Sequence, residues 1–335
     1  MNISETPKTD DRPETDLAQR TGGGGDTPPP SAPPRRRRRG IGRSGRWEIA
    51  LLAGPAVIFF VGFVIIPVIL AAYYGFFNWH GYGPATDFIG LKNYVTILTD
   101  PDFQEALGHN AFIVVMSLLI QGPVALLLAL LLNRKMRGQS LIRVLIFVPY
   151  VIAEVVVGTG FSLMLATNGA LNGLLDDLGL SGLTRDWLSD PSIAIWTLVA
   201  ILTWKYVGFA VILFLAGLQG IPDELYEAAA IDGATGTVRF WRITLPMLGP
   251  TLLFVIIVLT TRAFQAYGEI DLLTDGGPRP QNPTTTITYL TYGSQSIIAN
   301  DDGLQAATAV LLFVVLLVLS LLQLRGIGRR VHYAG

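Results

Sequence analysis

The chain has 335 residues, of which 51% are hydrophobic and only 15% are charged. A soluble domain of this size carries more charge, so the composition predicts a membrane protein. The formal net charge of −1 provides no global field that would attract nucleic acid. The absence of cysteine excludes disulfides and thiolate metal sites.

Residues 1–45 predict a disordered cytoplasmic tail, because they combine four glycines at 22–25, three prolines at 28–30 and few apolar residues. Five arginines at 35–39 stand just before the first apolar segment. We interpret this run as a topology signal rather than as a nucleic-acid-binding arm, because positive charge beside a membrane helix favours the cytoplasmic side.

Six apolar segments follow, each long enough to cross a hydrocarbon core of about 30 Å. Lysine and arginine gather in the tail, between the second and third segments, between the fourth and fifth, and after the sixth. Under the positive-inside rule, both termini are expected in the cytoplasm. The sequence therefore predicts an all-α, multi-pass protein of the lipid bilayer. The expected transmembrane domain covers residues 46–330, with spans at about 49–72, 111–132, 144–166, 193–218, 248–267 and 306–324.

Three prolines inside the predicted spans, Pro67, Pro123 and Pro149, indicate kinks, because membrane helices tolerate proline and are often bent by it. The connecting segments 87–110 and 167–192 predict short amphipathic pieces at the outer surface.

The polar segment 219–246 lies between the fourth and fifth predicted spans and faces the cytoplasm in this topology. Its first half predicts a short helix that begins at Pro222, which suits the first helical position. This helix is expected to end at Asp232 and Gly233, because glycine adopts the left-handed conformation at low cost.

A second short helix is predicted in the same segment, with Thr235 or Thr237 as its N-cap and Pro246 at its end. The two helices would form a helix–turn–helix held just outside the bilayer, which we interpret as a docking element. Spacing alone also fits an ordinary loop between two membrane helices.

The residues from Glu227 to Pro246, EAAAIDGATGTVRFWRITLP, resemble the EAA loop of permease subunits in ATP-driven, binding-protein-dependent (ABC) importers. In that family the loop docks into a cleft on a separate ATPase subunit. The resemblance therefore implies the six-helix type I importer permease fold and a coupling role for this loop. The positions that match the family pattern are Glu227, Ala228, Ala229, Asp232, Gly233, Ala234, Phe240, Leu245 and Pro246.

The resemblance also implies partners in a bacterial plasma membrane: a second homologous permease subunit, two copies of an ATP-binding subunit and an extracytoplasmic substrate-binding protein. The sequence has no GxxxxGK(S/T) loop, no HExxH and no GxSxG. We therefore expect a non-enzymatic subunit without a metal or cofactor of its own, with ATP and Mg²⁺ bound by the partner ATPase.

Three ionisable residues lie inside predicted spans: Glu154, Lys205 and Arg262. Each costs at least about 2.5–3.5 kcal/mol on insertion scales, so each is expected to face a cavity or a partner. Two interpretations stay open. In one, Glu154 and Lys205 pair and tie the third and fourth spans together. In the other, these residues line a substrate path that comprises Lys205, Arg262, Glu154, Tyr206, Gln265 and Tyr267.

Two cations in the path would suit an anionic substrate, because a phosphate needs charge-assisted hydrogen bonds in place of its hydration. The runs YGEIDLLTDGGP (267–278) and RRVHY (329–333) resemble the A-type permease subunit of glycerol-3-phosphate or glycerophosphodiester importers. Disaccharide permeases share most of these features, so a neutral di- or oligosaccharide is the alternative.

The sequence gives little support to two other classes of membrane protein. An ion-coupled secondary transporter predicts internal inverted repeats, and the sequence shows no convincing repeat. A membrane enzyme needs carboxylates or histidines clustered at one face, and Glu269 and Asp271 alone are weak support.

Overall fold

The computed structural model describes residues 43–134, 136–276, 283–293, 298 and 301–328. The arginine run and most of the predicted tail lie outside the described residues, as do Gly277, Pro278 and the RRVHY run. The chain divides into two units, residues 1–56 and 57–335. The packing described below lies within the second unit.

Within the described residues the secondary structure is helical, apart from one isolated bridge between Phe77 and Phe88. This confirms the all-α prediction. The α-helices are α1 (Arg43–Phe60), α2 (Ile66–Tyr74), α3 (Lys92–Thr99), α4 (Pro101–Met116), α5 (Gly122–Leu132), α6 (Gln139–Val151), α7 (Glu154–Met164), α8 (Ala170–Asp177), α9 (Ala194–Gln219), α10 (Asp223–Ile231), α11 (Gly236–Arg239), α12 (Leu245–Met247), α13 (Gly249–Gln265), α14 (Gly268–Leu273), α15 (Ile287–Tyr292) and α16 (Asp302–Gly328). Three π-helical turns, η1 (Val61–Ile65), η2 (Ser117–Gln121) and η4 (Phe240–Thr244), and one 3-10 turn, η3 (Ser181–Leu183), complete the series.

Several of these helices are long and apolar enough to cross a membrane. Two bent pairs pass the same test together: α6 with α7, bent by 91°, and the helix Gly236–Met247 with α13, bent by 68°. The described residues thus hold four candidate spans, or six if each bent pair is one span, which agrees with six apolar segments. The four single spans are Leu51–Tyr74, Pro101–Leu132, Ala194–Gln219 and Asp302–Gly326.

The second span is longer than the apolar segment 111–132 that predicted it. Its helix begins at Pro101. The carboxylate of Asp100 accepts hydrogen bonds from the backbone N–H groups of Asp102 and Phe103, and proline suits the first helical position. The later half of segment 87–110 is therefore part of a long helix rather than a separate amphipathic piece.

The third predicted span, 144–166, is divided into two helices. Ile152 and Ala153 have extended backbone, with ψ of 132° and 143°, between α6 and α7. Pro149 lies in the last turn of α6, where it removes a backbone donor and weakens the helix. The kink expected at this proline is thus a full break, and it opens the chain where Glu154 begins α7.

Three other prolines share one local structure. Pro67, Pro123 and Pro246 each stand two residues after a π-helical turn, following η1, η2 and η4. In a regular helix the proline ring collides with the carbonyl one turn earlier, and the wider π-turn relieves that contact. The helix predicted to close at Pro246 ends one residue later, at Met247, where the chain bends by 68° before α13.

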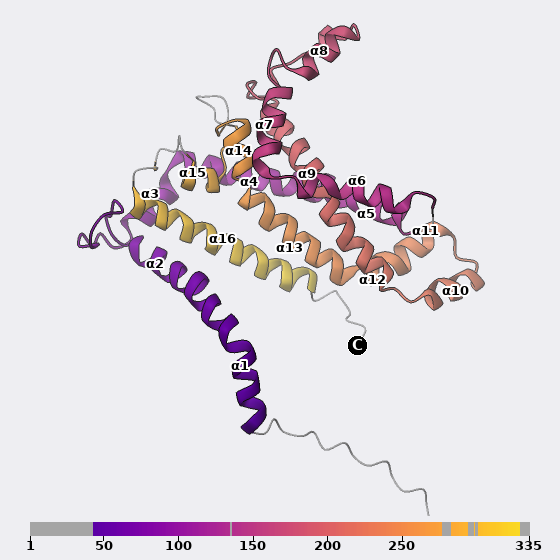
Figure 1. Ribbon diagram of the computed structural model, residues 1–335, viewed down its shortest axis with the longest axis horizontal. Coiled ribbons are helices and arrows are strands. Elements are labelled where there is room, and N and C mark those ends of the chain that lie inside the picture. Colours follow the sequence, from indigo (N-terminus) through magenta and orange to yellow (C-terminus); the bar gives the residue numbers. More distant parts are fainter. Residues whose placement is uncertain (1–42, 135, 277–282, 294–297, 299–300, 329–335) are drawn as a thin grey trace, which may run out of the picture. The chain divides into compact units, whose positions relative to one another are not determined.

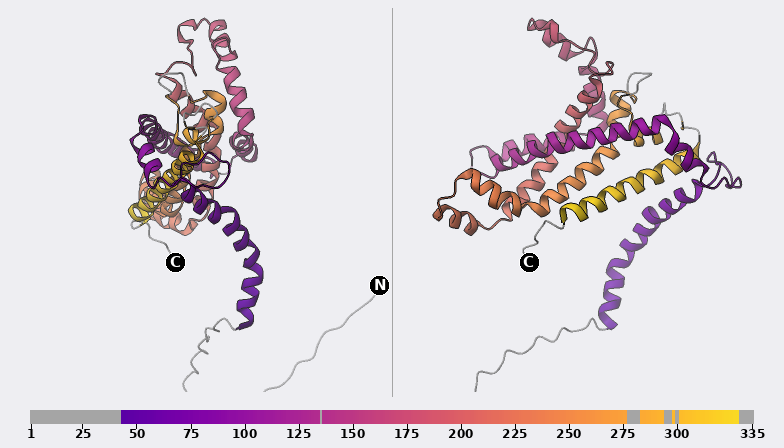
Figure 2. Two further views of the ribbon diagram at one scale, coloured as in Figure 1. Left: turned by 90° about the vertical axis from the view of Figure 1, so that its left-hand side faces the viewer. Right: turned by 180° about the vertical axis from the view of Figure 1, so that it is seen from behind.

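Helix α9 forms the centre of the bundle. It packs against α5, α6 and α13, and 56% of its apolar window is buried. Its close approach to α6 depends on Gly208, because a Cβ there would lie 2.2 Å from the backbone oxygen of Ile146. Figures 1 and 2 show α10 and α11 at one end of this bundle and α14 and α15 at the other.

Candidate substrate cavity and coupling segment

A buried ion pair joins α9 to α14. The Nζ atom of Lys205 lies 2.8 Å from Oε1 of Glu269, and the two side chains are only 2% and 1% exposed. The hydroxyl of Tyr206 donates to the same oxygen at 2.5 Å. The break after α13 makes this contact, because it turns α14 back against α7 at the level of Lys205.

The ion pair changes the interpretation of the two cations that were predicted in the substrate path. Lys205 also lies 3.9 Å from Glu154, so the expected contact exists, but the nearer partner is Glu269. The positive charge of Lys205 is therefore compensated inside the protein. Glu269 was missed as a partner because it follows the predicted fifth span in a segment assigned to a loop. The available signal was a pair of carboxylates, Glu269 and Asp271, among the apolar residues of GEIDLL.

Arg262, near the end of α13, has a different environment. Its guanidinium carbon lies 5.6 Å from the ring centre of Tyr206 and 6.0 Å from that of Tyr150. Its Nη2 atom donates to the Tyr150 hydroxyl at 3.3 Å. No salt bridge to Arg262 occurs among the residues that the structure describes. Arg262 is thus held by aromatic rings, and its charge is free to meet a ligand.

These groups surround a cavity of about 400 Å³. The break between α6 and α7 supplies one wall, and α9 and α13 supply the rest. Of the six predicted path residues, Glu154, Lys205, Tyr206 and Arg262 line the cavity. Gln265 and Tyr267 do not, and the Tyr267 hydroxyl instead donates to the backbone oxygen of Tyr292 at 3.3 Å. The full lining is Tyr150, Ile152, Ala153, Glu154, Lys205, Tyr206 and Arg262.

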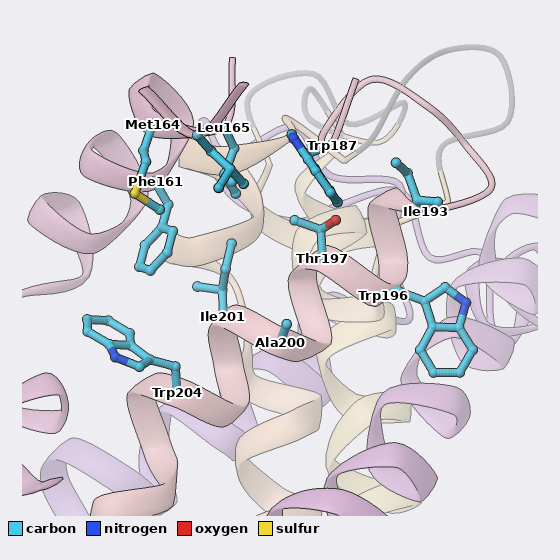
Figure 3. Close-up of a pocket in the computed structure, with 11 residues that line it drawn as sticks. Phe161, Met164, Leu165, Trp187, Ile193, Trp196, Thr197, Ala200, Ile201 and Trp204 are labelled. Atoms are coloured by element: carbon cyan, nitrogen blue, oxygen red, sulfur yellow. The ribbon is translucent and has the colours of Figure 1, made fainter. Parts of the chain in front are cut away.

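A second cavity, of about 640 Å³, lies between α7 and the first half of α9. Figure 3 shows aromatic and aliphatic side chains around it, with Trp187, Trp196 and Trp204 among them. No ionisable side chain lines this cavity. It therefore offers no charged group to replace the hydration of a charged ligand, whereas the smaller cavity does.

The predicted docking segment forms two helices, as expected. Helix α10 begins at Asp223, one residue later than predicted, because Pro222 is its N-cap and has extended backbone. Gly233 ends the helix with φ of +74°, in the left-handed region that favours glycine. Thr235 is the N-cap of the second helix, and its hydroxyl accepts from the backbone N–H of Val238. The turn chemistry read from the sequence is therefore confirmed.

The surface of this segment is mostly open. Glu227, Ala228, Asp232 and Gly233 are exposed, whereas Ala229 is buried against the rest of the chain. One of the three consecutive alanines is therefore not available to a docking partner.

The fold, with its polar cavity and its two-helix segment between spans, defines a multi-pass membrane transport subunit. Residues 121–333 match the family described as "binding-protein-dependent transport system inner membrane component", and the chain belongs to this family. It is a permease subunit of the sugar-type ABC importers, and its homologues are permease subunits rather than enzymes.

Two curated relatives illustrate the match. The chain is 35% identical to the sn-glycerol-3-phosphate transport system permease protein UgpA of Agrobacterium fabrum, over 84% of this chain and 95% of that protein. It is 34% identical to the multiple sugar-binding transport system permease protein MsmF of Streptococcus mutans, over 83% and 94% respectively.

Two solved structures of ABC transporters are also similar to this chain. A bacterial ABC transporter involved in the import of the acidic polysaccharide alginate matches with a TM-score of 0.71 and 25% identity, over 85% of this chain and 96% of that one. The bacterial alginate transporter in complex with an alginate pentasaccharide-bound periplasmic protein matches with a TM-score of 0.69 and 25% identity, over 84% and 94%.

Proposed function

We propose that this chain forms half of the translocation path of an ATP-driven importer for sn-glycerol-3-phosphate or glycerophosphodiesters. The observation that carries the proposal is the free guanidinium of Arg262 at a cavity of about 400 Å³. The name of the Agrobacterium relative supports the same substrate class.

The chemistry of the cavity supports a phosphorylated ligand. A phosphate that leaves water needs charge-assisted hydrogen bonds, and a guanidinium offers a planar set of donors that matches its oxygens. The rings of Tyr150 and Tyr206 hold Arg262 in place. The buried Lys205–Glu269 pair contributes indirectly, because it fixes the Tyr206 hydroxyl and so orients that ring.

The segment 219–246 is proposed to couple this path to an ATPase. Two copies of an ATP-binding subunit, which hold ATP and Mg²⁺, would dock on this segment and on that of a second homologous permease. An extracytoplasmic binding protein would deliver the ligand, as the periplasmic protein in the alginate complex suggests. ATP binding then biases the transporter between two states through its different affinity for each. Both termini would lie in the cytoplasm of a bacterium.

A neutral di- or oligosaccharide is the second candidate. Glu154 is 51% exposed and lines the same cavity, where its charge opposes that of Arg262 for an anionic ligand. Aromatic rings beside charged and polar groups also suit a sugar, and the Streptococcus relative is named for multiple sugars.

Uptake into proteoliposomes tests the proposal. The complex co-purified with this chain would be supplied with its binding protein, internal ATP, and either sn-glycerol-3-phosphate, glycerophosphocholine or a neutral disaccharide. We expect ATP-dependent uptake of a phosphorylated ligand, lowered about tenfold or more by Arg262→Gln because a charge-assisted hydrogen bond is lost.

Arg325→Gln, on the exposed last turn of α16, is the matched control and should leave uptake unchanged. Uptake of the disaccharide alone would favour the second candidate. Uptake without ATP would indicate an ion-coupled transporter.

A further inference from the structure

The long second span contains a polar turn at its middle. The π-helical turn η2 packs against both α9 and α13, the two helices that carry Lys205 and Arg262. Ser117 and Gln121 stand at the two ends of this turn and are only 6% and 2% exposed. π-Helical turns inside α-helices are often found at functional sites.

The amide nitrogen of Gln121 is not satisfied by the protein. It is fully enclosed and has no hydrogen-bond partner among the residues that the structure describes, and Ser117 is buried one turn earlier on the same π-helical turn. A membrane offers no water to such groups, so an unpaired amide in a span is costly and needs an explanation. Packing does not supply one, because an apolar side chain of the same size would fill the space without that cost.

The two side chains open onto a small crevice of about 10 Å³. Tyr206 and Arg262 line this crevice and also line the cavity of about 400 Å³. A volume of this size is about that of one water-sized group. The crevice therefore adjoins the larger cavity at the side chains of Tyr206 and Arg262, and its exposed lining is mainly apolar.

We propose that Ser117 and Gln121 form a subsite for one hydroxyl group of the transported ligand, whose anionic group lies on Arg262. This inference rests on the proposed function and adds a second recognition element to it. A hydroxyl fits better than a phosphoryl or carboxylate oxygen, because serine and glutamine both donate and accept, and only a hydroxyl can use both capacities. The subsite therefore selects a hydroxylated anion, such as a polyol phosphate.

The test compares ligands that differ by one hydroxyl. Uptake by the complete transporter would be measured for sn-glycerol-3-phosphate and for its two deoxy analogues, propane-1,2-diol phosphate and propane-1,3-diol phosphate. The wild type and Gln121→Met would be assayed with the same binding protein. For each ligand, the uptake by the wild type is divided by the uptake by the variant, and this ratio removes the binding protein's own preference among the ligands.

We expect Gln121→Met to lower uptake of sn-glycerol-3-phosphate about tenfold, from the loss of one hydrogen bond in a dry site, and to leave one deoxy analogue nearly unaffected. Thermal stability should be unchanged or higher, because the amide has no protein partner to lose. Gln323→Met is the matched control: its amide donates to Thr260 at 2.8 Å and does not line the crevice, so it should not alter the ratio.

Three results would overturn the inference. An equal loss for all three ligands would show that Gln121 is structural, holding a resident water. Unchanged uptake of all three would show that the subsite is not used. Failure of the wild type to take up sn-glycerol-3-phosphate would overturn the subsite as stated, and failure with glycerophosphocholine as well would refute the proposed substrate. Only the last of these touches the proposed function.

Discussion

The buried pair of Lys205 and Glu269 gives the sharpest prediction for stability. Glu269→Gln keeps the shape and an acceptor for the Tyr206 hydroxyl, but leaves the ammonium of Lys205 without its close counter-charge. Breaking a buried ion pair from one side costs about 3–5 kcal/mol, because an uncompensated charge remains in a low-dielectric site.

Two distances set the expected magnitude. Lys205 loses a carboxylate at 2.8 Å and keeps that of Glu154 at 3.9 Å, so the lower end of the range, about 3 kcal/mol, is expected. Glu154→Gln is the matched control. Its side chain is 51% exposed, so its loss should cost less than about 1 kcal/mol.

The assay is the midpoint of thermal unfolding of the purified complex, with the two single variants and the double variant Lys205→Met/Glu269→Gln. Glu269→Gln should lower the midpoint by several degrees. The double variant should recover most of that loss because no buried charge is left unpaired, and Glu154, which loses its contact with Lys205, is 51% exposed. If Glu269→Gln were no more harmful than Glu154→Gln, the reasoning from burial and distance would be refuted.

Two further predictions concern helix contacts and coupling. Gly208→Ala should destabilise the protein by about 1–3 kcal/mol, because the new Cβ meets a backbone carbonyl of α6. Gly160→Ala is the control in the same unfolding assay, and it should be neutral or slightly stabilising because the space around Gly160 is open. Glu227→Ala and Gly233→Val should each reduce uptake by the complex while ATP hydrolysis continues. Glu224→Ala, on the same helix, is the control. Uptake equal to that of the wild type in both Glu227→Ala and Gly233→Val would argue against docking at this segment.

Much of the fold was predictable because hydropathy alone marks segments that cross a bilayer. The left-handed conformation of Gly233 and the N-cap at Thr235 were also predictable, because each depends on local backbone chemistry. The break after Pro149 was expected only as a kink. Its size depends on how α14 packs against α7, which no local pattern reports.

The cavity was predictable in part. Formal charge drew attention to Lys205 and Arg262, but sequence reasoning could not show that one of them is neutralised, because its partner Glu269 is 64 residues away along the chain. Ser117 and Gln121 escaped notice because uncharged polar residues are common in membrane helices. Only their burial, and the unpaired amide nitrogen of Gln121, make them unusual.

The two connections between the docking segment and the cavity differ mechanically. On one side, α9 is a continuous helix from Lys205 to Gln219, without a proline or a π-turn. This part of the helix is roughly 21 Å long at 1.5 Å per residue. On the other side the chain passes through η4 and bends by 68° before α13 reaches Arg262. A displacement of segment 219–246 is therefore expected to be transmitted along α9 to Lys205, whereas the bend before α13 would reduce the part that reaches Arg262. The cavity wall formed by α9 would then move relative to the wall formed by α13.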